Sequence, residues 1–201
     1  MANTTAANIV VGEAVVRVGT SNLTMTGTDF DALRHVGYTQ GGVEISWEPD
    51  MVDIEVDQFG DAAKVIQSKV KVMVKTTMAE GTLENLAVAW SYNSTLANSD
   101  SASADLVSNL DGTNTTTFKF GGQNVYPFEK AIQIEGNAPN STASTTYTRK
   151  FRTKRAISME STTISMKRAE ATVFAVSFRV LPASDDTGYE YGKIIDQKPA
   201  A

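Results

Sequence analysis

Five carboxylates on an alternating stretch are the side chains best placed to do chemistry in this sequence. They are Glu44, Glu48, Asp53, Glu55 and Asp57. Carboxylates two residues apart on a strand lie about 7 Å apart, because each residue advances a strand by ~3.4 Å. That separation is too wide for one calcium ion without further ligands, and the calcium loop D-x-D-x-D-G is absent. The stretch is therefore interpreted as an acidic, solvated sheet face.

Lysines alternate on the next expected strand, at Lys69, Lys71 and Lys75. Antiparallel pairing is expected to set the later acids, Asp53–Asp57, opposite these lysines, at ~0.2–1 kcal/mol per pair. The earlier acids Glu44 and Glu48 then remain spare and bias the polar face toward negative charge.

A basic cluster follows much later in the chain, and it consists of Arg149, Lys150, Arg152, Lys154 and Arg155. One interpretation is a phosphate-binding strip, since Tyr147 and Phe151 lie beside it as in grooves that stack single-stranded bases. The whole chain is acidic, however, with a formal net charge of −5. A basic patch between subunits, complementary to acids on a neighbouring copy, is the favoured interpretation.

Catalytic and metal-binding chemistry has little support. The chain has no cysteine and one histidine, His35, which excludes disulfides, thiolate chemistry and zinc sites built on cysteine or on paired histidines. The motifs G-x-S-x-G and H-E-x-x-H are absent, and a hydrolase using Asp53 and Asp57 has only their spacing in its favour. We therefore predict no catalytic residue, no cofactor and no metal, and a protein that is not an enzyme.

The dominant hydrophobic period is two, which predicts strands with one polar face and an antiparallel sheet. Alternation runs through Val43–Glu48, resumes after Pro49, and returns in Lys69–Lys75, Ala131–Glu135 and Val173–Val180. One helix is expected from Leu83 to Trp90, with Thr77–Glu80 as its capping box or with a later start at Thr82.

The length of 201 residues suits one domain, 1–201, with mobile terminal arms. Residues 93–117 are rich in Ser, Thr, Asn and Asp and are expected to be a polar surface insertion or loop. The N-terminus lacks the features of a secretion signal, and no run approaches the ~18 apolar residues of a membrane span, so a soluble protein made in the cytosol is expected.

Several segments together resemble the tail tube proteins, or major tail proteins, of long-tailed bacteriophages. They are VGYTQGGVEISWEP at 36–49, IEVDQ at 54–58, AEGTLENLAVA at 79–89 and TVFAVSFRVLP at 172–182. The resemblance implies a β-sandwich or partial barrel with one flanking α-helix. It also implies hexameric rings that stack into a tube around a tape-measure protein, between tail terminator and distal tail proteins. Double-stranded DNA then passes through the bore without specific binding, and no membrane is a partner. The protein is expected in the virion tail after assembly in the host cytoplasm.

Ring-to-ring contacts in that family imply a role for the connection at about Asp57–Gln67. It is expected to be a long hairpin loop that buries apolar side chains on the adjacent ring, through Phe59, Gly60, Asp61, Lys64, Val65 and Ile66. The five acids named first are expected to face the bore, where they would repel phosphate. An alternative is another virion ring protein, or a β-sandwich module that binds a ligand through its polar loops.

Overall fold

The computed structural model describes residues 12–21, 23–25, 28–55, 57, 61–98, 104–110, 114–121, 126–139, 141, 145–159, 162–164, 168, 171–185 and 188–198. The described chain is mainly β, with one α-helix, α1 (Leu83–Ala89), beside a large antiparallel sheet. This confirms the β-rich fold class with one flanking helix.

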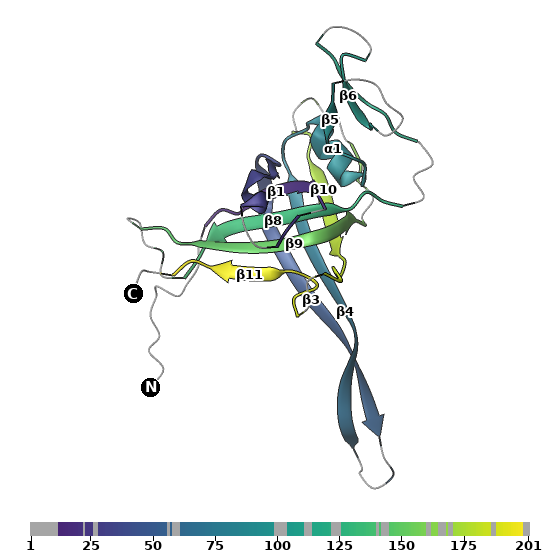
Figure 1. Cartoon of the computed structure of the whole chain (residues 1–201), viewed down its shortest axis with the longest axis vertical. Coiled ribbons are helices and arrows are strands. Elements are labelled where there is room, and N and C mark those ends of the chain that lie inside the picture. The colour runs from purple at the N-terminus through teal and green to yellow at the C-terminus, as the bar shows by residue number, and fades with distance from the viewer. Residues whose placement is uncertain are drawn as a thin grey trace.

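The large sheet has the strand order β2-β1-β8-β9-β10-β4-β3, with β11 also paired to β9. Its strands are β1 (Val15–Thr20), β2 (Arg34–His35), β3 (Thr39–Glu55), β4 (Ala62–Met78), β8 (Lys130–Asn137), β9 (Thr148–Ser158), β10 (Phe174–Val180) and β11 (Lys193–Asp196). A short 3₁₀ helix, η2 (Asp29–Ala32), precedes β2. In Figure 1, β8, β9 and β11 cross in front of β3 and β4, so the sheet folds over on itself in a sandwich-like manner.

The main core lies between the two halves of this folded sheet. One half contributes Val16, Val18, Ile132, Ile134 and Phe151, and the other contributes Val72, Val74, Phe174, Val176 and Phe178. The alternation seen in the sequence is the cause, because every second side chain of these strands points to the same face. Burial of each such side chain stabilises the fold by roughly 1.5–3 kcal/mol.

The helix begins later than a capping box at Thr77 requires. Thr77 lies inside β4, where it pairs with Gln40 and Ala175. Thr82 is the N-cap, and its hydroxyl accepts a hydrogen bond from the backbone N–H of Asn85 at 3.2 Å. The capping-box prediction is therefore wrong, and the later start at Thr82 is confirmed.

The polar stretch expected at 93–117 contains a small sheet of its own. Its strands are β5 (Leu96–Ala97), β6 (Leu106–Ser108) and β7 (Thr116–Phe118), in the order β5-β6-β7. The rings of Trp90 and Phe118 lie 5.9 Å apart and join this sheet to the end of α1. In Figure 1 this sheet and α1 lie at one end of the molecule, and the β3–β4 hairpin projects from the other.

Candidate assembly interface

The β3–β4 hairpin is the most distinctive feature of the molecule. Both strands are 17 residues long, which is roughly 55 Å at ~3.3 Å per residue. Strand β10 pairs only with the part of β4 from Val72 to Met78, so the rest of the hairpin extends past the sheet. The strands in the far half of the hairpin pair only with each other among the described residues, and this half protrudes in Figure 1.

Pro49 lies inside β3, opposite Val70, and does not end the strand. A proline is tolerated there because β3 is an edge strand and its outer N–H groups have no ladder partner. Since β3 continues through this point, Ile45 and Trp47 point to one face and Val52 and Ile54 to the other. The break in the alternation at Pro49 is therefore not the end of a strand. It marks the point where the apolar side chains of β3 change from one face of the hairpin to the other.

The pairing of acids and lysines is the reverse of the expected one. Lys75 pairs with Glu44, Lys71 with Glu48 and Lys69 with Asp50. The Lys71 amine and the Glu48 carboxylate lie 3.2 Å apart, and this hydrogen bond lowers the pKa of Glu48. Both side chains are half-exposed, so the pair contributes little to stability.

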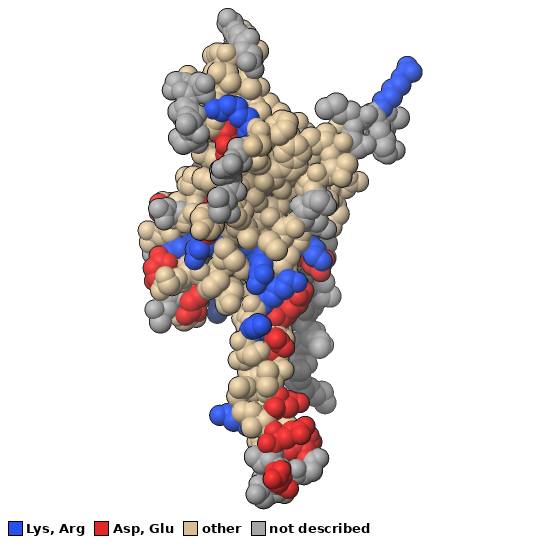
Figure 2. Space-filling model, turned by 90° about the vertical axis from the view of Figure 1, so that its right-hand side faces the viewer, with Lys and Arg blue, Asp and Glu red and all other residues tan. Residues whose placement is uncertain are grey.

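The later acids have no lysine opposite them. Asp53 pairs with Val65 and Glu55 with Ala62. Together with Asp57 and Asp61 they are exposed near the end of the hairpin, and we call these four residues the tip acids. Figure 2 shows carboxylates gathered toward that end, with most of the hairpin's lysines closer to the body.

The cause of this changed register is a shorter connection than expected. Strand β4 begins at Ala62, so most of the segment predicted as a loop at Asp57–Gln67 is strand. Lys64, Val65 and Ile66 pair with Ile54, Asp53 and Val52. The loop prediction is wrong for these residues, because β-branched side chains favour the extended pairing. Asp61 directly precedes β4, and Phe59 and Gly60 lie outside the described residues.

The far half of the hairpin exposes large apolar side chains on both faces. Val52, Ile54 and Ile66 share one face and are 45%, 41% and 40% exposed, while Val65 on the other face is 56% exposed. A protruding hairpin with exposed apolar side chains and free edges is the kind of surface through which proteins associate with another chain, and it is the candidate interface here.

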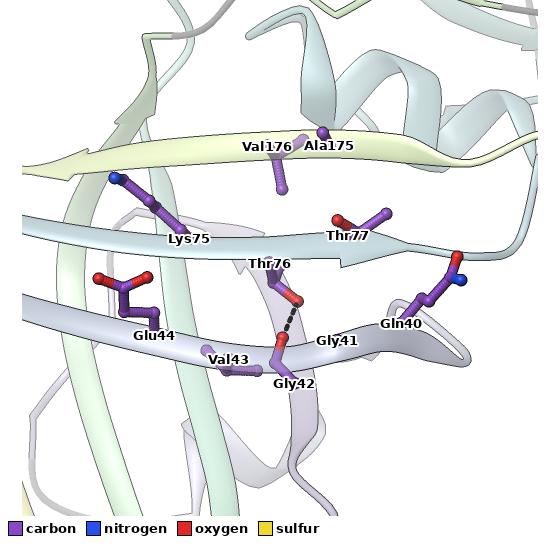
Figure 3. A pocket seen from close by; sticks show the side chains of 10 residues that line it. All are labelled: Gln40, Gly41, Gly42, Val43, Glu44, Lys75, Thr76, Thr77, Ala175 and Val176. Atoms are coloured by element: carbon purple, nitrogen blue, oxygen red, sulfur yellow. Dashed lines mark hydrogen bonds between the residues drawn. The ribbon is translucent and has the colours of Figure 1, made fainter.

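A hollow of about 340 Å³ lies at the root of the hairpin, beside Gly41 and Gly42. The two glycines are extra residues in β3, because Gln40 pairs with Thr77 and Val43 with the adjacent Thr76. Both have positive φ, near +80°, a conformation that glycine adopts at low cost. Figure 3 shows the Thr76 hydroxyl donating to the Gly42 carbonyl at 3.1 Å, and Glu44 and Lys75 projecting on the same side of their strands.

The basic cluster on β9 is paired with carboxylates of its own chain. Charged atoms of each pair lie 2.6–3.3 Å apart in Arg149–Asp196, Lys150–Asp31, Arg152–Asp31, Lys154–Asp185 and Arg155–Glu129. Strand β9 has one extra residue where it pairs with Lys130–Ile132. This residue shifts the alternation, so the side chains that face the core are odd-numbered at Phe151 and even-numbered at Ala156. These cations join η2, β11 and loops to the sheet, and the basic patch predicted between subunits stays a prediction.

Asp31 is the centre of this network. It accepts hydrogen bonds from Lys150 at 2.7 Å, from Gln133 at 2.9 Å and from Arg152 at 3.3 Å. The hydrogen bonds from Lys150 and Gln133 lower the pKa of Asp31 to about 2. Nothing in the sequence indicated this role, because Asp31 lies more than 100 positions from all three partners.

Lys130 is a second residue that sequence patterns did not reveal. Its side chain is 1% exposed, and its amine donates to the Tyr92 carbonyl at 2.5 Å and to the Ser94 hydroxyl at 3.3 Å. Burial, with Arg34 nearby, lowers the pKa of Lys130 to about 7. This amine connects β8 to the segment that leads into β5.

The Nδ1 atom of His35 accepts a hydrogen bond from the Gly37 N–H at 2.8 Å. No group of three or more His, Cys, Asp or Glu residues in the described part of the chain could hold a metal ion. The helices within the described ranges include none with the length and hydrophobicity needed to cross a bilayer.

No protein-family model matches this chain, and no curated protein matches its sequence.

Proposed function

We propose that this protein is a structural subunit that self-assembles into stacked hexameric rings, and that these rings form the tail tube of a long-tailed bacteriophage. The observation that carries the proposal is the hairpin of two 17-residue strands, which projects past the body with exposed apolar side chains on both faces. Such a structure is a liability in a monomer, and a neighbouring copy that buries it removes the liability.

The free strand edges support the same proposal. Strand β3 ends the sheet on one side and β2 on the other, and β2 has only two residues. Edges of this kind allow sheets from neighbouring copies to join, and a closed ring of joined sheets has no edge left. The ordered sequence segments that resemble tail tube proteins give the particular form of the assembly.

The charge supports a conduit for DNA. Six copies at −5 each give 6 × −5 = −30 per ring. A negative wall repels phosphate, so double-stranded DNA passes without binding. The tape-measure protein, the tail terminator and the distal tail proteins are the other proposed partners, and the proposed location is the virion tail.

Electron microscopy of the purified protein, with light scattering across a concentration series, tests this proposal. Long tubes, or rings that stack on concentration or nucleation, support it. A strict monomer at high concentration contradicts it, and discrete rings or monomers that bind a ligand support the alternative of another virion ring or a binding module.

A further inference from the structure

An aromatic cluster lies where the β5-β6-β7 sheet meets α1, at the end of the molecule opposite the hairpin (Figure 1). Its members are Trp90, Tyr92, Phe118 and Phe120, and we call them the end cluster. The centroids of neighbouring rings lie 5.4–5.9 Å apart, in edge-on and tilted arrangements. Aromatic pairs favour these arrangements, so the four rings support one another.

Three rings of the end cluster are half-buried and form its base. Trp90 is the C-cap residue of α1, and its indole N–H donates to the Thr162 carbonyl at 3.4 Å. Phe118 is the last residue of β7. The Tyr92 hydroxyl accepts a hydrogen bond from the Gly121 N–H at 3.1 Å. The base is therefore tied to a helix end, to a strand and to the backbone beyond that strand.

Phe120 is the exposed member of the end cluster. Its ring contacts Trp90 and Phe118, yet the residue is 68% exposed. The Tyr92 hydroxyl lies beside it, because its hydrogen-bond donor Gly121 directly follows Phe120. A phenol hydroxyl that accepts one hydrogen bond still has a proton to donate. The surface thus combines an open aromatic ring with a polar group at its side.

The chain around the end cluster is polar but almost uncharged. Of the 36 residues from 91 to 126, 16 are Ser, Thr or Asn and four are charged, with Lys119 as the one cation. Figure 2 shows few charged side chains at the upper end of the molecule. Nucleic acids and anionic lipids bind to clusters of cations, and charged peptides to a surface of opposite charge. The composition of this region therefore favours a neutral ligand.

A neutral sugar has the complementary chemistry. The C–H groups on the face of a pyranose ring pack on an aromatic ring, and the hydroxyls at its rim bond to phenol, hydroxyl and amide groups. We propose that the end cluster binds neutral oligosaccharides, with Phe120 as the stacking ring and the Tyr92 hydroxyl as a polar contact. The site lies at the other end from the hairpin, so this inference is independent of the proposed assembly.

Fluorescence titration tests the site, because Trp90 is one of only two tryptophans in the chain. Trp47→Phe leaves Trp90 as the only reporter, and the probes are maltohexaose, cellohexaose and the hexamer of N-acetylglucosamine, each up to about 10 mM. At least one probe is expected to change the Trp90 emission in a saturable way. In that background, Phe120→Ala is expected to weaken binding about tenfold or more, while Phe120→Tyr keeps the affinity within about threefold.

Two further variants separate the polar contact and the general effect of losing a ring. Tyr92→Phe keeps the ring but removes the hydroxyl, and it is expected to weaken binding by about threefold or more. Tyr38→Ala removes a ring that is 82% exposed on the body of the molecule, and it is expected to leave the affinity unchanged. Thermal unfolding of each variant, with midpoints expected within about 3 °C of each other, separates lost binding from lost fold.

Saturation-transfer NMR on the wild-type chain gives a measurement without a reporter residue, and it is expected to show transfer to the ring C–H protons of the bound sugar. The absence of a saturable signal with all three probes overturns the site. Equal affinities of the Phe120→Ala and Tyr38→Ala proteins also overturn it. Tube formation is measured separately by electron microscopy, so these outcomes leave the proposed function standing, and a failure to form tubes or rings leaves the sugar site standing.

Discussion

Asp31 and Lys150 form an ion pair at 2.7 Å across 119 positions of the sequence. Asp31 lies on η2 and Lys150 on β9, so the pair fastens the 3₁₀ helix to the sheet. The same carboxylate also contacts Gln133 and Arg152, and one side chain thereby holds three positions of the β8–β9 pair.

Asp31→Asn is expected to lower the free energy of unfolding by about 1 kcal/mol near pH 6, after discounting for solvent screening at a partly exposed group. The pKa of Asp31 is lowered to about 2 in the folded state from 3.8, so its stabilisation is present above about pH 4 and is lost as the pH falls toward 2. Urea unfolding from pH 2 to 7 measures the difference. Asp29→Asn, on the same 3₁₀ helix, is the control, and a difference that persists unchanged at pH 2 would contradict this explanation.

Lys130→Met is expected to change the pH dependence of stability. The pKa of Lys130 falls to about 7 on folding from 10.5, so between pH 7 and 10 the unfolded chain binds more protons than the folded chain. The titration of Lys130 therefore makes the free energy of unfolding of the wild type increase with pH between pH 7 and 10. The variant lacks this amine, so its free energy of unfolding lacks this increase. Lys64→Met, on the exposed hairpin, is the matched control. Equal slopes for wild type and Lys130→Met would show that the buried amine does not titrate in this way.

The double change Val52→Thr and Ile66→Thr is expected to leave the monomer within about 0.5 kcal/mol of wild-type stability, because both side chains are exposed and threonine favours strands. Tube formation is expected to fail, since the face that these residues share loses its apolar surface. Electron microscopy and thermal unfolding measure the two effects, and Leu110→Thr is a control on an exposed residue of the opposite end. Hydrogen exchange in wild type is expected to be slower for hairpin amides in tubes than in monomers, most clearly for the outward-facing amides of β3, which have no ladder partner among the described residues of the single chain. Equal exchange in both states contradicts the role of the hairpin in assembly.

Gly41→Ala and Gly42→Ala are each expected to cost about 1 kcal/mol of stability, because both positions have positive φ but open space around an added Cβ. Gly37→Ala is expected to cost clearly more. Its Cβ would overlap the Glu80 carboxylate, which accepts a hydrogen bond from the Tyr38 N–H. Thermal unfolding of the three variants separates backbone strain from steric overlap, and equal losses would contradict the distinction.

The sequence by itself determined the fold class and much of the core. Alternation of Phe174, Val176 and Phe178 predicted a one-sided strand, and these three side chains are buried in the core. The helix after Thr82 was also visible, because its cap and its apolar stripe are local features of the chain. Such patterns depend on the period of each element and need no partner.

Only the tertiary structure decided which charges meet. Glu48 reaches Lys71 rather than remaining spare, because the turn of the hairpin lies closer to Glu55 than the loop prediction assumed. The β9 cations are paired inside the chain because Asp31, Glu129, Asp185 and Asp196 come to the same strand from four distant segments. An ion pair depends on a distance of a few ångströms, and the composition of one strand carries no information about the segments that fold against it.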